Sequence, residues 1–233
     1  LALPAVYGAL TILPVATIAK DHFGKATGVI AAWLIAFMPA HVTHSTWGLA
    51  DHDSFVMLFI AIGFMFYLRA VKYAGSERLV KTTSIHPLDM LRAMGAVAQQ
   101  RKYAMSNAVL AGVAFGAASL GWKGFVVGPA ILFLAYASQV ALNMFRRRDS
   151  TTINVLFISM LAVNFLMAIP FYAHPQLNLV TDGTGLLPLL FIAAFTITIA
   201  FVTTGFRDKP WLLVLGVLAG GSAVFFSVLY ILK

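Results

Sequence analysis

Long apolar stretches dominate this chain and restrict its possible folds more than any other feature. A segment of about 17–25 apolar residues is long enough to cross a bilayer as a helix. Backbone polar groups in lipid must be satisfied within the segment, so such stretches become helices. The sequence therefore predicts an all-α polytopic membrane protein with about eight transmembrane helices. The predicted stretches are residues 3–19, 26–43, 54–71, 104–121, 124–145, 152–172, 186–205 and 210–231.

The composition excludes most other classes of protein. Hydrophobic residues make up 61% of the 233 residues and charged residues only 10%, whereas a soluble domain carries about 25% charged residues. Too few polar groups are present to cover a water-soluble surface, which excludes a soluble enzyme, a disordered region and a nucleic-acid-binding domain. Cysteine is absent, which excludes disulfides and thiolate metal sites as well.

The net charge of +8 is explained by membrane topology. If successive breaks alternate between two faces, every Lys and Arg except Lys123 and Lys233 falls on one face, which the positive-inside rule makes cytoplasmic. The longest interruption, residues 73–103, is predicted to be a cytoplasmic loop with one or two short amphipathic helices. Residues 1–233 are expected to form a single transmembrane domain. Because the chain opens inside an apolar stretch, we expect it to be an internal fragment of a longer protein.

Acidic residues and histidines gather in one break on the opposite, extracytoplasmic face. The titratable residues there are His41, His44, Asp51, His52 and Asp53. Alternate side chains of an extended segment face the same way, so the two carboxylates can converge on one hard cation. Oxygen ligands of this kind suit Mg²⁺ or Mn²⁺.

Two other interpretations of this segment stay open on the pattern alone. Asp and Ser are favoured at helix N-caps, and the third apolar stretch begins at about Ser54, so Asp53 fits a capping or solvated role. His41 and His44 have helical spacing and, with Asp51, match a set of zinc ligands. Interfacial histidines are more often simply solvated.

The same segment resembles the catalytic subunit of oligosaccharyltransferases. In that family a Pro-containing turn leads into a short motif of the form S-R-[ST]-x-x-G-x-x-D-x-[DEH], and the next span follows at once. Gly48 falls on the glycine of this motif, and Asp51 and Asp53 fall on its D-x-D. A second similarity is a span of small residues followed by a Trp-Gly-aromatic turn. The matching segments are residues 23–25, 36–39 and 44–53, and then 112–116 and 121–125.

The resemblance implies roles for individual residues. Asp51 is expected to be a catalytic residue that ligates Mg²⁺ or Mn²⁺ and lies near the acceptor amide. Asp53 is expected to be the second catalytic carboxylate, which binds the metal or orients its surroundings. His52 is expected to point away. His44 stands where the family usually has Arg, so it is a candidate substrate-binding residue with a weaker or pH-dependent donor, and His52 is a second such candidate.

The resemblance also implies a reaction and its partners. A GT-C-type membrane domain would transfer an oligosaccharide from a polyprenyl (pyro)phosphate carrier in the lipid bilayer to Asn in an Asn-x-Ser/Thr sequon. The protein is expected in a prokaryotic cell membrane, with its active site outside. Three further family motifs are absent: a first acidic motif, a second metal carboxylate and a W-W-D sequon-binding motif. The fragment alone is therefore predicted to be inactive. The alternatives are another GT-C glycosyltransferase with a polyprenyl-phosphate sugar donor, and a transporter.

Overall fold

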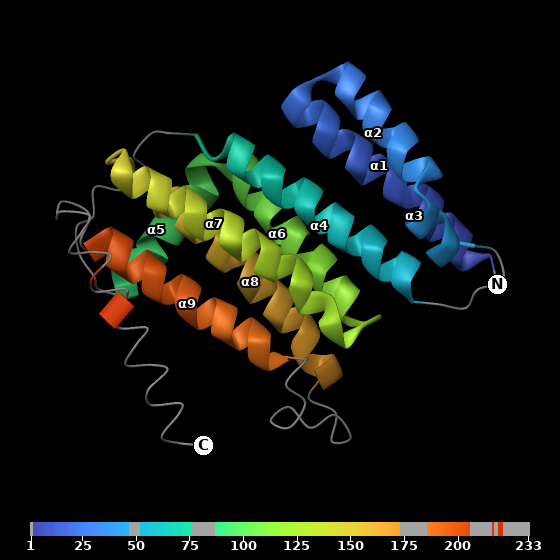
Figure 1. Ribbon diagram of the computed structural model, residues 1–233. Helices are drawn as coiled ribbons and strands as arrows, with labels where there is room; N and C mark the ends of the chain where they lie inside the picture. Colours follow the sequence, from blue (N-terminus) through green and yellow to red (C-terminus); the bar gives the residue numbers. More distant parts are fainter. Residues whose placement is uncertain are drawn as a thin grey trace.

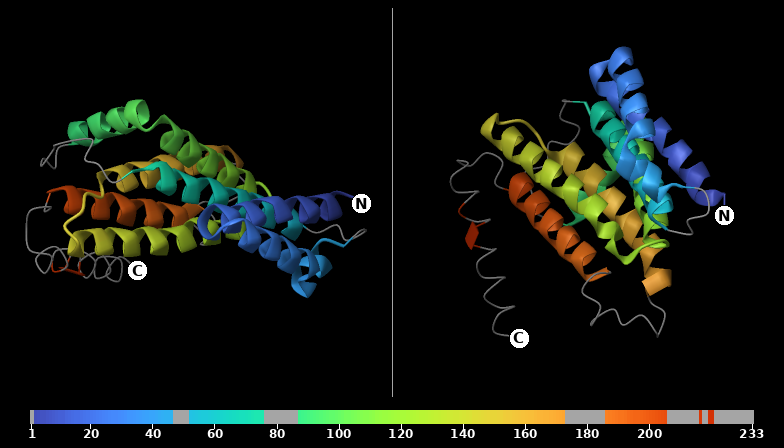
Figure 2. Two further views of the ribbon diagram at one scale, coloured as in Figure 1. Left: turned by 90° about the horizontal axis from the view of Figure 1, so that it is seen from above. Right: turned by 45° about the vertical axis from the view of Figure 1, so that its right-hand side comes forward.

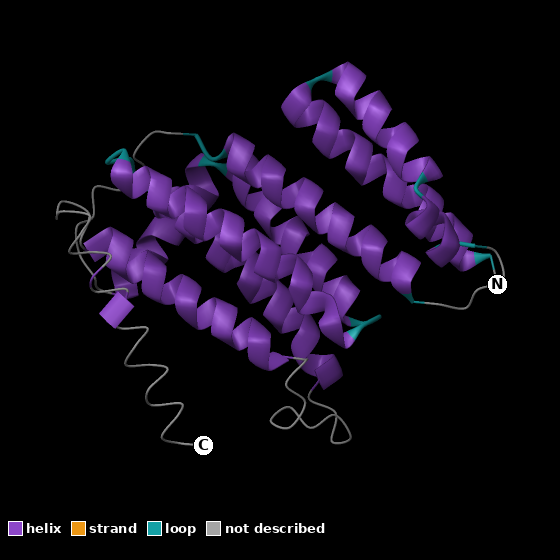
Figure 3. Cartoon of the chain, in the orientation of Figure 1, coloured by secondary structure: helices purple, strands orange, loops and turns teal. Residues whose placement is uncertain are grey.

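The computed structural model describes residues 2–46, 52–75, 87–172, 186–205, 216 and 219–220. Within these ranges the chain forms helices joined by short turns, and it forms no strand (Figure 3). The helices are α1 (Leu3–Phe23), α2 (Lys25–Phe37), α3 (Pro39–His44), α4 (Asp53–Tyr73), α5 (Pro87–Gln100), α6 (Lys102–Ser119), the 3₁₀ turn η1 (Lys123–Val126), α7 (Val127–Phe145), α8 (Thr151–Tyr172) and α9 (Leu186–Gly205).

The chain is an all-α polytopic membrane protein, as the apolar stretches predict. Among the described residues, α1, α4, η1 with α7, α8 and α9 are long and apolar enough to cross a bilayer. The predicted stretches up to residue 205 each overlap a helix. The last one, 210–231, lies almost entirely outside the described residues, so the total of about eight spans stays a prediction.

The second predicted stretch, 26–43, is not one continuous helix. It divides at Met38, whose backbone is extended (φ −64°, ψ 118°), into α2 and the short helix α3. The following residue, Pro39, causes this break, because proline disfavours the helical conformation of its predecessor and supplies no N–H for the helix. Pro39 then starts α3 at a position where proline is favoured.

The helices form a bundle in which α1 and α2 pair at one side (Figure 1). Helix α1 packs on α4, α4 on α6, α6 on α8, and α8 on α9, as two further views also show (Figure 2). Helix α6 approaches α8 very closely: a Cβ added at Gly112 would lie 2.5 Å from the carbonyl oxygen of Met160, and one at Gly116 would lie 2.6 Å from the Cβ of Met167. Small residues at this spacing let membrane helices approach each other.

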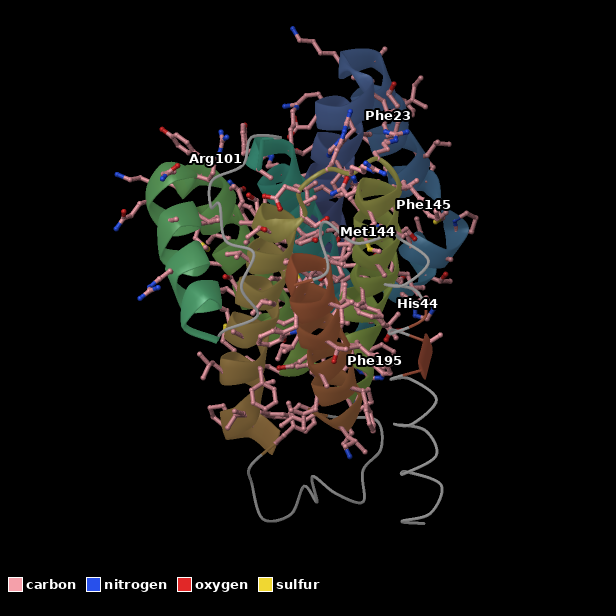
Figure 4. All side chains as sticks on the ribbon, turned by 90° about the vertical axis from the view of Figure 1, so that its left-hand side faces the viewer. Phe23, His44, Arg101, Met144, Phe145 and Phe195 are labelled. Atoms are coloured by element: carbon pink, nitrogen blue, oxygen red, sulfur yellow. The ribbon has the colours of Figure 1, made fainter. Side chains whose placement is uncertain are left out.

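The bundle has two chemically distinct ends. Helices α1 and α4 run parallel: the rings of Tyr7 and Phe55 are 5.5 Å apart near their starts, and Arg69 Nε donates to Asp21 Oδ2 at 2.8 Å near their ends. Among the described residues, the Lys and Arg side chains other than Lys123 and Arg92, which lies within α5, belong to the helix ends on the side of Asp21. In the view of Figure 4 the end with Asp21 is at the top: Phe23, Arg101 and Phe145 lie toward it, and His44 lies below them.

The long interruption after α4 contains a helix, as predicted for residues 73–103. Helix α5 has 14 residues and packs on α6 and α8. Its Val97 is fully buried in a small apolar cluster with residues of α4, α6 and α8. Helix α5 therefore packs against the bundle through the part of it that carries Val97. Its location on the cytoplasmic side and the single-domain assignment stay predictions.

Candidate functional site

The predicted D-x-D segment lies where α4 begins. Asp53 is the first residue of this helix, in its first turn, where a negative charge is stabilised by the helix dipole. The N-cap position belongs to His52, which makes no side-chain capping hydrogen bond. The Ser54 hydroxyl is buried and has no hydrogen-bond partner among the described residues. Neither Asp53 nor Ser54 therefore acts as the N-cap of α4.

Two histidines lie against the carboxylate of Asp53. His44 Nδ1 is 2.8 Å from Asp53 Oδ2, and because a carboxylate only accepts, the imidazole is the donor. His52 Nε2 is 3.6 Å from the other oxygen, Oδ1. We expected His52 to point away, but its ring lies near this carboxylate. The Asp53 side chain is 40% exposed. A half-open carboxylate held by an imidazole can accept a cation or a substrate donor.

His44 reaches Asp53 because α3 lies against the start of α1. His41 Nε2 is 3.1 Å from the carbonyl oxygen of Gly8 and donates a hydrogen bond to it. One turn later, Ser45 packs on the bare backbone of Gly8, where a Cβ would lie 2.3 Å from the Ser45 Cβ. The Ser45 hydroxyl closes the last turn of α3 by donating to the carbonyl of His41 at 2.7 Å.

The second segment of the family resemblance lies at the same end of the bundle. Gly121, in the turn between α6 and η1, packs on the start of α4: an added Cβ would lie 2.8 Å from the Phe55 ring and 3.1 Å from Val56. Trp122 follows in this turn and is 44% exposed. The α6–η1 turn therefore supports the first turn of α4, which carries Asp53.

The predicted site residues are thus brought together only in part. His44, His52 and Asp53 cluster at one point, whereas Asp51 lies outside the described residues. Within the described part of the chain, no group of three or more His, Asp or Glu side chains is arranged to hold a metal ion. Asp53 fits a hard cation by its chemistry, since the hydrogen bond from His44 leaves lone pairs on the carboxylate. Further ligands must come from Asp51 or from other segments.

Local sequence patterns did not reveal the contribution of Gly8. It lies 33 residues before His41 along the chain, in a helix that carries no chemical motif. The available signal was the absence of a side chain on a membrane helix, which often marks a close helix contact. That signal does not identify the partner.

Comparisons with known proteins show which proteins this chain is similar to. The family model "Oligosaccharyl transferase STT3, N-terminal" matches residues 1–207. Dolichyl-phosphooligosaccharide-protein glycotransferase 3 of Archaeoglobus fulgidus is 30% identical over 173 residues, which are 72% of this chain and 18% of that protein. Dolichyl-monophosphooligosaccharide–protein glycotransferase AglB of Haloferax volcanii is 30% identical over 189 residues, 80% of this chain and 17% of that protein. The chain therefore spans less than a fifth of these relatives' length. No solved structure matches it.

Proposed function

This chain belongs to the STT3 family of oligosaccharyl transferases, and we propose that it is part of the membrane domain of an enzyme that glycosylates Asn-x-Ser/Thr sequons. Both curated relatives carry names of lipid-oligosaccharide–protein glycotransferases. The observation that supports the site assignment most directly is the Asp53–His44 pair, 2.8 Å apart. This pair lies at the end of the bundle opposite most of the described Lys and Arg side chains, and by the positive-inside rule we propose that this end is extracytoplasmic.

The proposed reaction transfers a sugar between two groups at the outer membrane surface. The bond between the anomeric carbon and the carrier phosphate breaks, and the phosphate oxygen leaves with the electron pair. A bond forms from the anomeric carbon to the amide nitrogen of the acceptor Asn, and the proton lost from this nitrogen passes to the released phosphate or to water. The donor is a polyprenyl (pyro)phosphate-linked oligosaccharide, and the acceptor is a polypeptide that carries the sequon. We propose that the protein lies in a prokaryotic cell membrane.

This chain supplies part of the machinery. Asp51 is proposed to lie beside the acceptor amide, and Asp53 to share a divalent cation, Mg²⁺ or Mn²⁺, with it. A bound cation would stabilise the negative charge that develops on the leaving phosphate. His44 holds the Asp53 carboxylate by a hydrogen bond, so the carboxylate keeps one orientation while the acceptor is bound. His52, near the other oxygen, is proposed to contact a polar group of the substrate. By itself, this 233-residue chain is expected to show no transfer.

The test replaces the two carboxylates in the full-length protein. Asp51→Ala and Asp53→Asn are each expected to lower the transfer of a lipid-linked oligosaccharide to a sequon peptide by about 100-fold or more, because losing one group that stabilises transition-state charge typically costs 10²–10³. Asp149→Asn is the matched control: Asp149 accepts from the Thr151 backbone N–H at the opposite end of the bundle, and Asn caps helices equally well.

The outcomes separate the candidate functions. Loss of transfer in both site variants, with full transfer in Asp149→Asn, supports the assignment. Undiminished peptide glycosylation in Asp51→Ala contradicts it. Transfer of sugar to an acceptor other than a sequon peptide would instead indicate another glycosyltransferase with a polyprenyl-phosphate donor.

A further inference from the structure

Helix α3 depends on its neighbours for its position. It has six residues, and none of them is buried, whereas an isolated helix shorter than about 12 residues is marginal in water. The extended backbone at Met38 separates it from α2, so α2 does not fix its direction. Among the described residues, α3 contacts α1, α2 and α4. These contacts therefore determine where its histidines lie.

The contact with α1 is specific to glycine at position 8. A Cβ there would lie 2.3 Å from the Ser45 Cβ and 2.7 Å from its Oγ, closer than any side chain tolerates. Gly8 is buried, and its carbonyl also accepts the His41 hydrogen bond at 3.1 Å. The backbone of Gly8 therefore contacts α3 and the residue after it in two ways, by close packing against Ser45 and by the hydrogen bond from His41.

The two faces of α3 link this contact to the site. His41 points to α1, and His44, three residues on, pairs with Asp53 at the start of α4. Helices α1 and α4 are themselves held in parallel near this point by the edge-to-face contact between Tyr7 and Phe55. A shift of α3 along α1 would therefore move His44 relative to Asp53 while leaving the α1–α4 contact in place.

We propose that Gly8 and His41 are positioning residues, which dock α3 on α1 so that His44 fixes the orientation of the Asp53 carboxylate. The inference rests on the proposed function and deepens it, because it assigns to α1 a part in setting the geometry of the metal- and acceptor-binding end. Neither residue is proposed to contact the substrate. They act through Ser45 and His44.

The first experiment tests the close contact by compensation. In the full-length protein, Gly8→Ala is expected to lower sequon-peptide transfer about 10- to 100-fold, since a displacement of about 1 Å in a catalytic constellation costs up to 10²-fold. Ser45→Gly removes the atoms that the new Cβ would meet, so the double variant Gly8→Ala/Ser45→Gly is expected to recover most of the lost activity. Ser45→Gly alone is the control for the loss of its hydroxyl.

A binding measurement accompanies the activity assay. The affinity of the full-length protein for Mn²⁺, followed by the electron paramagnetic resonance signal of the free ion, is expected to fall about 10- to 100-fold in Gly8→Ala, because residues that orient ligands typically contribute that much. It is expected to return in the double variant.

A second pair of variants avoids any steric clash. His41→Ala removes the hydrogen bond to the Gly8 carbonyl, whereas His41→Gln retains an N–H donor on a side chain of sufficient length. We expect His41→Ala to lower both Mn²⁺ affinity and transfer, and His41→Gln to restore both toward the original values. This pair keeps the proposal testable if Gly8→Ala fails to fold.

The outcomes distinguish this inference from the function beneath it. If Asp53→Asn is inactive while Gly8→Ala and His41→Ala are both fully active, the positioning role is overturned and the proposed function stays intact. An unrepaired defect in the double variant, together with equal defects in His41→Ala and His41→Gln, would overturn it as well. Full transfer in Asp53→Asn would instead overturn the proposed function.

Discussion

Asn154 joins three helices through a single buried side chain. The Tyr136 hydroxyl of α7 donates to Asn154 Oδ1 at 2.9 Å, and Asn154 Nδ2 donates to Thr203 Oγ1 of α9 at 3.1 Å. Thr203 in turn donates to the carbonyl of Ile199 at 2.7 Å. The Asn154 and Tyr136 residues are each 1% exposed. With no water to replace these bonds in the bilayer, each lost partner leaves a polar group unsatisfied.

This network predicts a measurable coupling between Asn154 and Tyr136. Asn154→Ala leaves the buried Tyr136 hydroxyl without its hydrogen-bond acceptor, and Tyr136→Phe leaves the Asn154 amide oxygen without its donor. Each variant is therefore expected to destabilise the protein by about 1–3 kcal/mol. The double variant is expected to lose about 0.6 kcal/mol less stability than the sum of the two single variants, the average that double-mutant cycles give for interhelical hydrogen bonds in a membrane protein. Thermal unfolding in detergent measures all three. Strictly additive effects would show that the bond contributes nothing.

At the site, the sequence pattern identified the residues and not their contacts. His44 and Asp53 were found from a family motif, and the structure brings them to 2.8 Å. The part played by Gly8 was not predictable, because a glycine gives no information about which distant segment will pack on it. The role of Asp51 stays a prediction, since Asp51 lies outside the described residues.

The contact between α6 and α8 depends on two glycines one turn apart. Gly112 faces the backbone of α8, where its missing Cβ would lie 2.5 Å from the Met160 carbonyl oxygen, and Gly116 faces Met167. Between them, Phe115 is fully buried. Lipid tails are as apolar as the helix surfaces, so close packing rather than water exclusion holds such helices together.

A larger residue at this contact should separate the two helices. Gly112→Val is expected to lower the melting temperature of the full-length protein in detergent. The new side chain would clash with the backbone of α8, which cannot move aside by changing a rotamer. Gly95→Ala in α5 is the matched control: nothing lies within 4 Å of the added Cβ, and alanine favours a helix over glycine by about 1 kcal/mol. Equal melting temperatures in the two variants would contradict this account of the α6–α8 contact.

Apolar length predicted the helices well and missed one division within them. The stretches up to residue 205 became helices because lipid leaves the backbone no other local solution. Pro39 was the sequence signal for the break at Met38. A hydropathy average over the whole stretch does not register a single proline, so the break was missed. For residues 73–103 the sequence predicted one or two short helices without bounds. Helix α5 has 14 residues, too few to span a bilayer, and it packs against the bundle instead.

At the scale of the whole molecule, most of the described Lys and Arg side chains lie at the opposite end of the bundle from the candidate site. The ion pair between Arg69 and Asp21 and the Lys72 hydrogen bond to the Asp21 carbonyl, both 2.8 Å long, lie at the basic end. His44 and Asp53 lie at the other end of α4. Cytoplasmic loops of membrane proteins carry an excess of Lys and Arg, so this separation predicts the orientation in the membrane.

Single cysteines can test that orientation, because the chain contains none of its own. We expect Thr46→Cys, next to α3, to react with a membrane-impermeant maleimide in intact cells. Arg148→Cys, after α7, is expected to react only once the membrane is permeabilised. Both are introduced into the full-length protein with any other cysteines replaced. The reverse pattern of labelling would invert the proposed sidedness and remove the site from the outer surface.

The sequence by itself determined the membrane class, the helical fold, the positions of most helices and the family, because these follow from apolar length and from short motifs that are local in the chain. Only the tertiary structure decided that α3 docks on Gly8, that His44 and His52 flank the Asp53 carboxylate, and that Gly121 supports the start of α4. The contacts of Gly8 and Gly121 join residues far apart in the chain, and His44 and Asp53 belong to two separate helices. They depend on which helix faces approach closely, a choice that packing makes and that local sequence leaves undetermined.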